Sequence, residues 1–179
     1  METSNDLEEK KENEKWKGEI KPYSSELQKD FFLFCEKMWP QLGRPWDPEK
    51  FQKDLLDIPG IYQKDGGNFW IARTEEEIVG CAGLKALNPE MAEFVRFYVL
   101  AENRGQKIGA ELLHTALHAA MQGNFKQVVL DTDSKKSVRA IEVFTSVGFK
   151  EIPPYKETPF SDLFFGLDLK NFICPFCKS

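Results

Sequence analysis

The pattern of hydrophobic and polar positions along the chain predicts three helices. Apolar residues recur every three or four positions over residues 24–38, 107–122 and 137–147, a spacing that places them on one face of a helix. Serines stand at the start of the first segment, and a glycine follows each of the other two, as is common where helices begin and end. Each helix therefore has an apolar face that can pack against a sheet.

Shorter runs rich in β-branched and aromatic residues predict the strands. These runs are residues 16–23, 68–73, 78–84, 93–100, 126–131 and 161–169. Proline and glycine are frequent over residues 39–48, which we predict to be a loop, and Asp47 is placed to cap a short helix over residues 49–56. An antiparallel run of strands followed by alternating helices and strands predicts an α/β fold class, with a mixed sheet in a single domain.

Composition limits the class of protein. The chain has 179 residues, of which 41% are hydrophobic, so it can build one globular core. Residues 1–15 are mostly charged and are predicted to be a flexible tail, residues 16–170 the folded domain, and residues 171–179 a short second tail. The net charge of −5 argues against nucleic-acid binding. Because we find no apolar run of membrane-spanning length and no secretory signal, we expect a cytoplasmic protein without a membrane partner.

The segment YVLAENRGQKIGAELL, residues 98–113, is the part of the sequence most suggestive of chemistry. A strand ends, a loop with glycines at 105 and 109 follows, and a long helix begins. This arrangement directs several backbone N–H groups and the positive end of a helix dipole at one point, where an anion such as a pyrophosphate can bind. An ordinary strand-to-helix loop with capping glycines has the same appearance, so the segment alone leaves both interpretations open.

The same segment resembles the acetyl-CoA signature of the GNAT superfamily of N-acetyltransferases, R/Q-x-x-G-x-G/A, although Lys107 stands where the signature has its middle glycine. The resemblance extends from about Ile20 to Leu169 and includes KQVVLDTDSKKSVRAIEVFTSVGFKEI and the final YKETPFSDLFFGLDL. It implies a mostly antiparallel, twisted sheet with a splayed central strand pair and helices on both faces. It also implies that acetyl-CoA is the cosubstrate.

The resemblance assigns cofactor contacts residue by residue. It implies that the backbone of Phe97, Tyr98 and Val99 pairs with pantetheine, that Ser137 and Phe144 lie beside the pantetheine arm, and that the pyrophosphate is wrapped by Arg104, Gly105, Gln106, Lys107, Ile108, Gly109 and Ala110. A lysine at 107 conflicts with a positive φ, whereas a negative φ would keep its amide available. Residues 135, 136 and 139 are basic and either meet the adenosine 3′-phosphate or form an exposed helix start.

Glu93 is the candidate general base, because it precedes Arg104 by the 11 residues at which many family members carry a catalytic glutamate. Strand alternation predicts that residues 93, 95, 97 and 99 share a face and that Arg96, on the opposite face, pairs with an acid. Phe144 replaces the tyrosine that donates a proton to the leaving thiolate in many relatives. Tyr155 is the candidate substitute, and a solvent proton is the alternative.

A CxxC motif, Cys174 to Cys177, closes the sequence, and two histidines, His114 and His118, lie four residues apart on a predicted helix. One CxxC supplies two zinc ligands and zinc takes four, so we predict no metal. Intermolecular pairing and a redox role for the two cysteines remain open alternatives.

The combined prediction is an acyltransferase that moves an acetyl group from acetyl-CoA to a primary amine by direct transfer in a ternary complex. The acceptor would be a small molecule or a protein, and the acidic balance favours a cationic one. A catalytically weak or inactive CoA-binding module that serves as a sensor or interaction protein is the alternative, and another acyl donor or an oxygen acceptor is a third. We expect a monomer or a homodimer.

Overall fold

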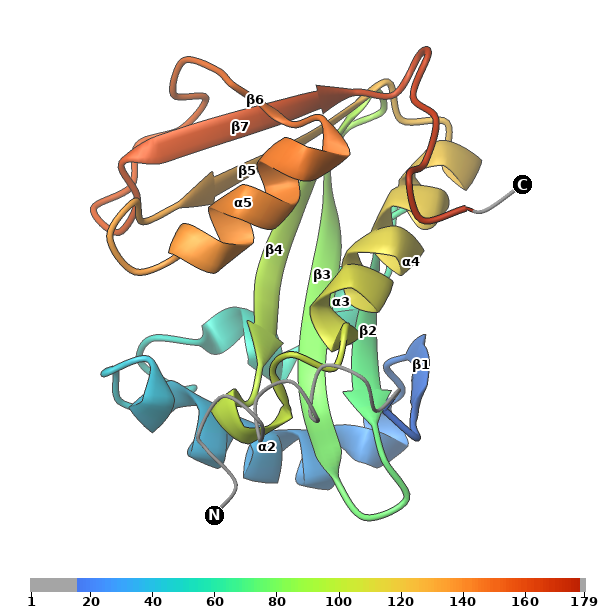
Figure 1. The fold of residues 1–179 in the computed structure, drawn as a ribbon. Helices are drawn as coiled ribbons and strands as arrows, with labels where there is room; N and C mark the ends of the chain where they lie inside the picture. Colours follow the sequence, from blue (N-terminus) through green and yellow to red (C-terminus); the bar gives the residue numbers. More distant parts are fainter. Residues whose placement is uncertain (1–15, 178–179) are drawn as a thin grey trace, which may run out of the picture.

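The computed structural model describes residues 16–177, so the predicted tail over residues 1–15 lies outside the described residues (Figure 1). Within this range the chain forms a seven-stranded sheet in the order β1-β2-β3-β4-β5-β7-β6. Its strands are β1 (Glu19–Pro22), β2 (Asn68–Arg73), β3 (Ile78–Asn88), β4 (Met91–Val99), β5 (Gln127–Thr132), β6 (Lys150–Glu151) and β7 (Leu163–Asp168). Its helices are α2 (Gln28–Gln41), α3 (Ile58–Ile61), α4 (Ile108–Gln122) and α5 (Val138–Val147), with 3₁₀ turns η1 (Ser25–Leu27), η2 (Lys53–Leu56) and η3 (Ala101–Asn103).

The sheet is antiparallel except between β4 and β5, which run parallel. These two central strands pair only over Met91–Glu93 and Gln127–Val129, and beyond Glu93 they separate (Figure 1). The prediction of a mixed, mostly antiparallel sheet with a splayed central pair is therefore confirmed. In this gap the backbone N–H and C=O groups of the two facing strand edges have no strand partner, and such groups need another hydrogen-bond partner. A ligand bound in the gap could supply that partner.

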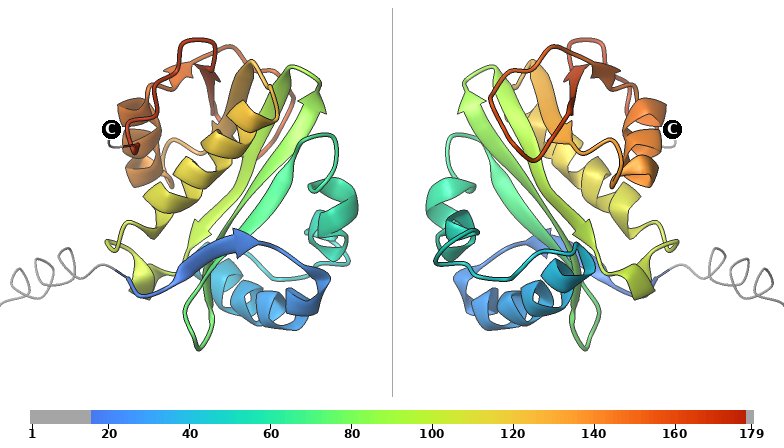
Figure 2. Two further views of the ribbon diagram at one scale, coloured as in Figure 1. Left: turned by 90° about the vertical axis from the view of Figure 1, so that its right-hand side faces the viewer. Right: turned by 90° about the vertical axis from the view of Figure 1, so that its left-hand side faces the viewer.

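Two apolar clusters hold the helices on opposite faces of the sheet (Figure 2). Helix α4 contributes its predicted apolar face to the first cluster, where Leu112, Leu113 and Leu117 are fully buried. Helix α2 contributes Phe31 and Trp39 to the second. Fully burying a side chain of this size contributes about 1.5–3 kcal/mol, so each helix is fixed mainly by this packing.

The structure corrects two predictions around the helices. Helix α2 continues through Gln41 rather than ending before a loop at 39, because Trp39 is buried and Pro40 falls in the last turn. The helix predicted over residues 49–56 is replaced by turns and the 3₁₀ turn η2, which bury Leu55. The two-residue strand β6 lies in the GFKEI stretch, where the family resemblance implied a strand after the helix, although so short a run carries no periodicity of its own.

Candidate active site

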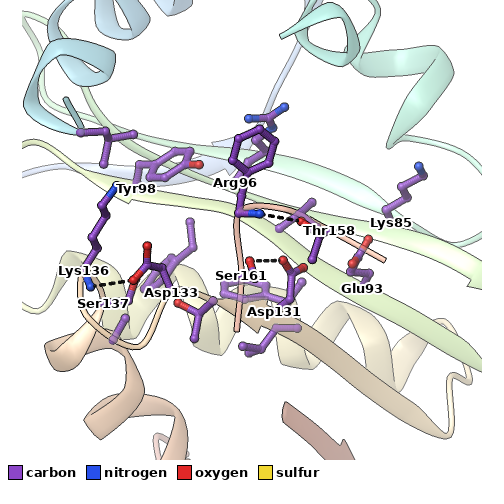
Figure 3. Close-up of a pocket in the computed structure, with 18 of the residues that line it drawn as sticks. Lys85, Glu93, Arg96, Tyr98, Asp131, Asp133, Lys136, Ser137, Thr158 and Ser161 are labelled. Carbon is purple, nitrogen blue, oxygen red and sulfur yellow. Dashed lines mark hydrogen bonds between the residues drawn. The ribbon is translucent and has the colours of Figure 1, made fainter. Parts of the chain in front are cut away.

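The divergence of β4 and β5 opens a cavity of about 460 Å³ in the middle of the sheet. Side chains from both separating strands line it, together with the start of α5 and the loop that precedes β7 (Figure 3). Glu93 occupies the last position at which β4 still pairs with β5. It is only 6% exposed, which makes it one of two buried polar side chains in the described part of the chain.

Two side chains contact Glu93, and two more extend the arrangement, which joins β4, β5 and the loop before β7. The Tyr155 hydroxyl donates a hydrogen bond to Glu93 Oε1 over 2.7 Å, and Lys156 Nζ lies 2.5 Å from the same oxygen. Lys156 Nζ also lies 2.6 Å from Asp131 Oδ1, so one ammonium bridges two carboxylates. The Ser161 hydroxyl donates to the other oxygen of Asp131. The structure thus brings the predicted pair, Glu93 and Tyr155, into direct contact.

The local electrostatics follow from this network. Burial raises the pKa of Tyr155, and its hydrogen bond to Glu93 and the nearby negative charges raise it further. Burial acts to lower the pKa of Lys156, but its hydrogen bonds to Asp131 and Glu93 outweigh that effect and raise it. Both groups therefore stay protonated at neutral pH, and each holds a proton towards a carboxylate.

Arg96 forms a second polar group in the same cavity. Its guanidinium contacts Asp54 through Nη2 at 2.6 Å and Nε at 2.9 Å, and the Tyr62 hydroxyl donates to the same carboxylate. Burial opposes the charge of Arg96, but the hydrogen bonds and the attraction of Asp54 outweigh it and raise its pKa. The expected pairing of Arg96 with an acid is confirmed, and it anchors the η2 segment to β4.

The predicted alternation along β4 is wrong beyond residue 95. The strand carries a bulge, since Gly83 faces Val95 whereas Cys81 faces Tyr98, and Arg96 adopts a φ of 53°. One extra residue reverses the side-chain alternation. Arg96 consequently lines the cavity together with Glu93, instead of facing away from it.

The sequence left the sign of φ at Lys107 open, and in the structure the loop before α4 adopts the strained conformation with a positive φ. Lys107 has a φ of 64°, so the residue in the position of the family's glycine does take the left-handed conformation. Gly105 also has a positive φ, of 85°. A lysine at such a φ costs about 1–2 kcal/mol, which the surrounding loop must offset. Within residues 16–177 the amides of residues 105–110 donate no backbone hydrogen bond.

The other predicted cofactor residues divide into two groups. Phe97, Tyr98, Ser137 and Phe144 line the cavity, whereas the loop residues 104–110 and Val99 do not. Phe97 and Phe144 pack against each other, with ring centroids 5.7 Å apart, and make one wall apolar. The carbonyl of Val99 accepts a hydrogen bond from Arg104 Nε over 3.1 Å, which ties the loop to the end of β4.

Gly109 has a packing role that the motif did not suggest. A Cβ at this position would lie 3.1 Å from Phe97 Cζ, so the absence of a side chain lets the first turn of α4 approach β4. The loop and the apolar wall of the cavity are therefore built against each other.

Sequence reasoning missed Asp131, Lys156 and Ser161. Asp131 lies two positions beyond the last β4–β5 pair. It is an acidic residue at the end of a buried strand, and this feature of the sequence could have marked it as a candidate site residue. Lys156 and Ser161 come from a loop with no periodicity, and no spacing in the sequence connects them to Glu93.

Comparison with known proteins identifies the family. The model described as the acetyltransferase (GNAT) family matches residues 31–149, more than half of the chain. The fold, the splayed strand pair and the loop before α4 agree with this match. The chain belongs to the GNAT acetyltransferase family.

Several relatives of similar sequence are named N-acetyltransferases. N-acetyltransferase 8B of Rattus norvegicus is 29% identical over 133 residues, covering 69% of this chain and 60% of that protein. N-acetyltransferase 8B of Homo sapiens is 31% identical over 123 residues, covering 64% of this chain and 54% of that protein. The chain therefore spans somewhat more than half the length of these relatives.

Solved structures share the fold over nearly the whole described domain. An acetyltransferase of the GNAT family from Staphylococcus aureus Mu50 matches with a TM-score of 0.75 and 25% identity, covering 86% of this chain and 99% of that one. The PaiA N-acetyltransferase from Thermoplasma acidophilum, solved in complex with coenzyme A, matches with a TM-score of 0.65 and 20% identity, covering 86% and 99%. Among residues 16–177, no helix combines the length and apolar character needed to cross a membrane.

Proposed function

We propose that the chain transfers the acetyl group of acetyl-CoA to a primary amine in a ternary complex. The observation that carries the proposal is the position of Glu93, a buried carboxylate at the point where β4 and β5 separate. Membership of the acetyltransferase family and the coenzyme A bound to the Thermoplasma acidophilum protein support acetyl-CoA as the donor.

The loop before α4 would hold the pyrophosphate of the cofactor. Its amides at residues 105–110 are available as donors, and the N-terminus of the 15-residue helix α4 adds a favourable dipole. Gly105 and Lys107 have the positive φ found in backbone nests, in which successive N–H groups point towards a common centre. The Lys107 ammonium would add charge attraction to the phosphates.

The pantetheine arm would enter the gap between the separated strands. Beyond Glu93 the edge of β4 that faces β5 has no strand partner, so its backbone groups at Phe97 to Val99 are suited to pair with the amides of pantetheine. Phe97, Phe144 and Ser137 would lie along the arm. This route brings the thioester towards Glu93.

Glu93 would accept a proton from the acceptor ammonium, directly or through water, and free the nitrogen lone pair. That nitrogen then attacks the thioester carbonyl carbon, a C–N bond forms, the C–S bond breaks, and CoA leaves as a thiolate. The new amide nitrogen releases its remaining extra proton to solvent. Glu93 and Asp131 together offer two carboxylates to a cationic acceptor, where they now hold the ammonium of Lys156. A cationic amine would compete with Lys156 for these oxygens.

Tyr155 suits a positioning role better than that of the acid. Its hydroxyl donates to Glu93 and does not line the cavity, and its raised pKa makes it a weak proton donor. Phe144 has no proton to give. The departing thiolate would therefore take a proton from solvent.

Thiol release from acetyl-CoA in the presence of a panel of amines tests the proposal, with each product identified by mass. Acetyl-CoA at about 100 times its Kd should raise the melting temperature by about 5–10 °C. A shift without turnover on any amine would favour the inactive CoA-binding module, and a melting curve that does not move would contradict both functions.

A further inference from the structure

Four potential metal ligands from two distant segments meet on the face of α4 that lies away from the cavity lining. His114 and His118 stand one turn apart on α4, and Cys174 and Cys177 belong to the segment after β7, which runs back along this helix (Figure 1). One ligand atom from each residue lies within 4.8 Å of the other three. His118 Nε2 is 2.9 Å and His114 Nε2 is 3.4 Å from Cys177 Sγ.

We propose that these residues form a structural zinc site. Two imidazoles and two thiolates are a common tetrahedral ligand set for Zn²⁺. With bonds of about 2.0–2.1 Å to nitrogen and 2.3 Å to sulfur, the nitrogen and sulfur ligands of such a site are about 3.6 Å apart. Both histidine-to-Cys177 distances, 2.9 and 3.4 Å, are shorter than that value, so these side chains would have to move apart by less than about 1 Å to admit an ion.

The chain builds this site from contacts that do not involve a metal. The amide of Cys177 donates to the carbonyl of Cys174 over 3.2 Å, which closes the CxxC turn and directs both thiols to one side. The ring of Phe176 packs against His114 with centroids 5.8 Å apart, and Phe172 and Phe176 join the core cluster beneath α4. Cys174 is buried at 6% exposure, whereas Cys177 is exposed and gives the ion a route of entry.

The sequence prediction of no metal rested on the count of ligands, because one CxxC supplies two of the four that zinc takes. The structure removes that premise, because the segment after β7 crosses to α4 and completes four ligands. A four-ligand site leaves no open position for a substrate, and none of the four residues lines the cavity. We therefore assign the zinc a structural role: it fastens the C-terminal segment to the helix whose N-terminus carries the loop 104–110.

The first test measures metal content and geometry in the full, reduced chain. We expect one zinc per chain after gel filtration, and removal by a strong chelator should lower the melting temperature by about 5–10 °C if free zinc had been held near 100 times its Kd. Replacement of zinc by Co²⁺ should give the visible bands of a tetrahedral ion together with a thiolate-to-cobalt charge-transfer band. A reduced chain that binds no stoichiometric zinc, or a cobalt spectrum without the thiolate band, would overturn the proposal.

The second test asks whether these four residues are the ligands. Cys177→Ser and His118→Gln should each weaken zinc binding by at least about 100-fold in competition with a chromophoric chelator, since loss of even a supporting contact costs 10–100-fold. Phe176→Ala is the matched control, because it alters the same turn but keeps all four ligands and should retain one zinc. Unchanged affinity in Cys177→Ser would refute the site, as would a Cys174–Cys177 disulfide that persists when zinc is present under reducing conditions. The cobalt spectrum of the wild type decides the question if a variant fails to fold.

Discussion

The loop before α4 and the cluster around Glu93 are two halves of one candidate active site, and they are built in opposite ways. The loop is a continuous stretch, residues 104–110, and offers mainly backbone amides. The Glu93 cluster gathers side chains from β4, β5 and the loop before β7, and its members lie up to 68 positions apart in sequence. The loop could therefore be recognised as a motif, whereas the cluster exists only in the folded chain.

The two regions also differ in how they tolerate a residue that departs from the family's usual one. Lys107 takes the left-handed conformation at the position of the family's glycine, and a backbone site needs only its amide. Phe144, in place of a tyrosine, removes a functional group outright, because a side-chain site depends on the atoms present. Substitutions should therefore affect the cluster strongly and the loop weakly.

The substitution Glu93→Gln should have the largest effect of all, and this effect should be on catalysis. The amide keeps the size of the side chain but does not accept a proton as a carboxylate does, so kcat/KM for the amine should fall by about 10²–10⁴-fold at neutral pH. The deficit should narrow as pH rises and more acceptor is already neutral. Glu90→Gln, at an exposed pair with Lys126 next to β4, is the matched control and should leave kcat/KM unchanged.

Steady-state kinetics from pH 6 to 9, with acetyl-CoA affinity measured separately, check this prediction. Wild-type turnover in Glu93→Gln across that range would exclude Glu93 as the base. It would also contradict the view that the cluster, unlike the loop, depends on its side-chain atoms.

The next effect concerns the Arg96–Asp54 pair, which anchors η2 to β4 beside the cluster. Asp54→Asn leaves the guanidinium of Arg96 without its charge partner, where the two side chains are only 26% and 23% exposed. Breaking such a partly buried pair should cost about 2–4 kcal/mol of unfolding free energy, measured by urea denaturation. Lys126→Met breaks an exposed pair with Glu90 and should cost less than about 1 kcal/mol. Equal costs for the two variants would show that Arg96 does not anchor η2.

Tyr155→Phe should have a smaller effect, because the tyrosine acts through Glu93. Loss of the 2.7 Å hydrogen bond should lower kcat/KM by about 10-fold, with KM for acetyl-CoA unchanged. A proton donor to the thiolate would instead give a loss that grows with the basicity of the leaving thiol, so a series of acyl thioesters distinguishes the two roles.

The raised pKa of Tyr155 gives a second measurement on the same variant. The folded chain holds this proton more tightly than the unfolded chain, so the stabilisation is complete below the ordinary tyrosine pKa of about 10 and is lost as pH rises above it. Between pH 9 and 11 the wild type should therefore lose about 1 kcal/mol more stability than Tyr155→Phe. If both proteins lose the same amount of stability over this pH range, the pKa of Tyr155 is not raised and the assignment of its hydrogen bond to Glu93 is contradicted.

The smallest effects belong to the loop. Lys107→Gly removes the left-handed strain and should stabilise the chain by about 0.5–1 kcal/mol, because glycine adopts a φ of 64° without penalty. The same change removes an ammonium and should weaken CoA binding by less than about 10-fold, a loss that shrinks at high salt. Calorimetry at two salt concentrations measures both quantities. A loss of CoA binding beyond 100-fold would mean that the side chain, not the backbone, carries the site.

The sequence by itself determined the parts of this protein that depend on neighbouring residues. Helical spacing placed α4 and α5 nearly to the residue, alternating and β-branched runs placed the strands β2 to β5, and the glycine-bearing loop identified the candidate cofactor site and the family resemblance. Each of these features rests on interactions over a few positions, which a local pattern records.

Only the tertiary structure decided the features that depend on distant contacts. The bulge at Arg96 turned that side chain into the cavity, and the pairing of β4 with β5 up to Glu93 placed Asp131 nearby. The loop before β7 brought Lys156 to both carboxylates, and the return of the last segment to α4 joined two cysteines to two histidines. A bulge shifts alternation by one residue without a mark in composition, and a loop closes on its partner at a cost in entropy that depends weakly on its length. The chemistry of this chain is therefore carried by residues that the sequence contains but does not place together.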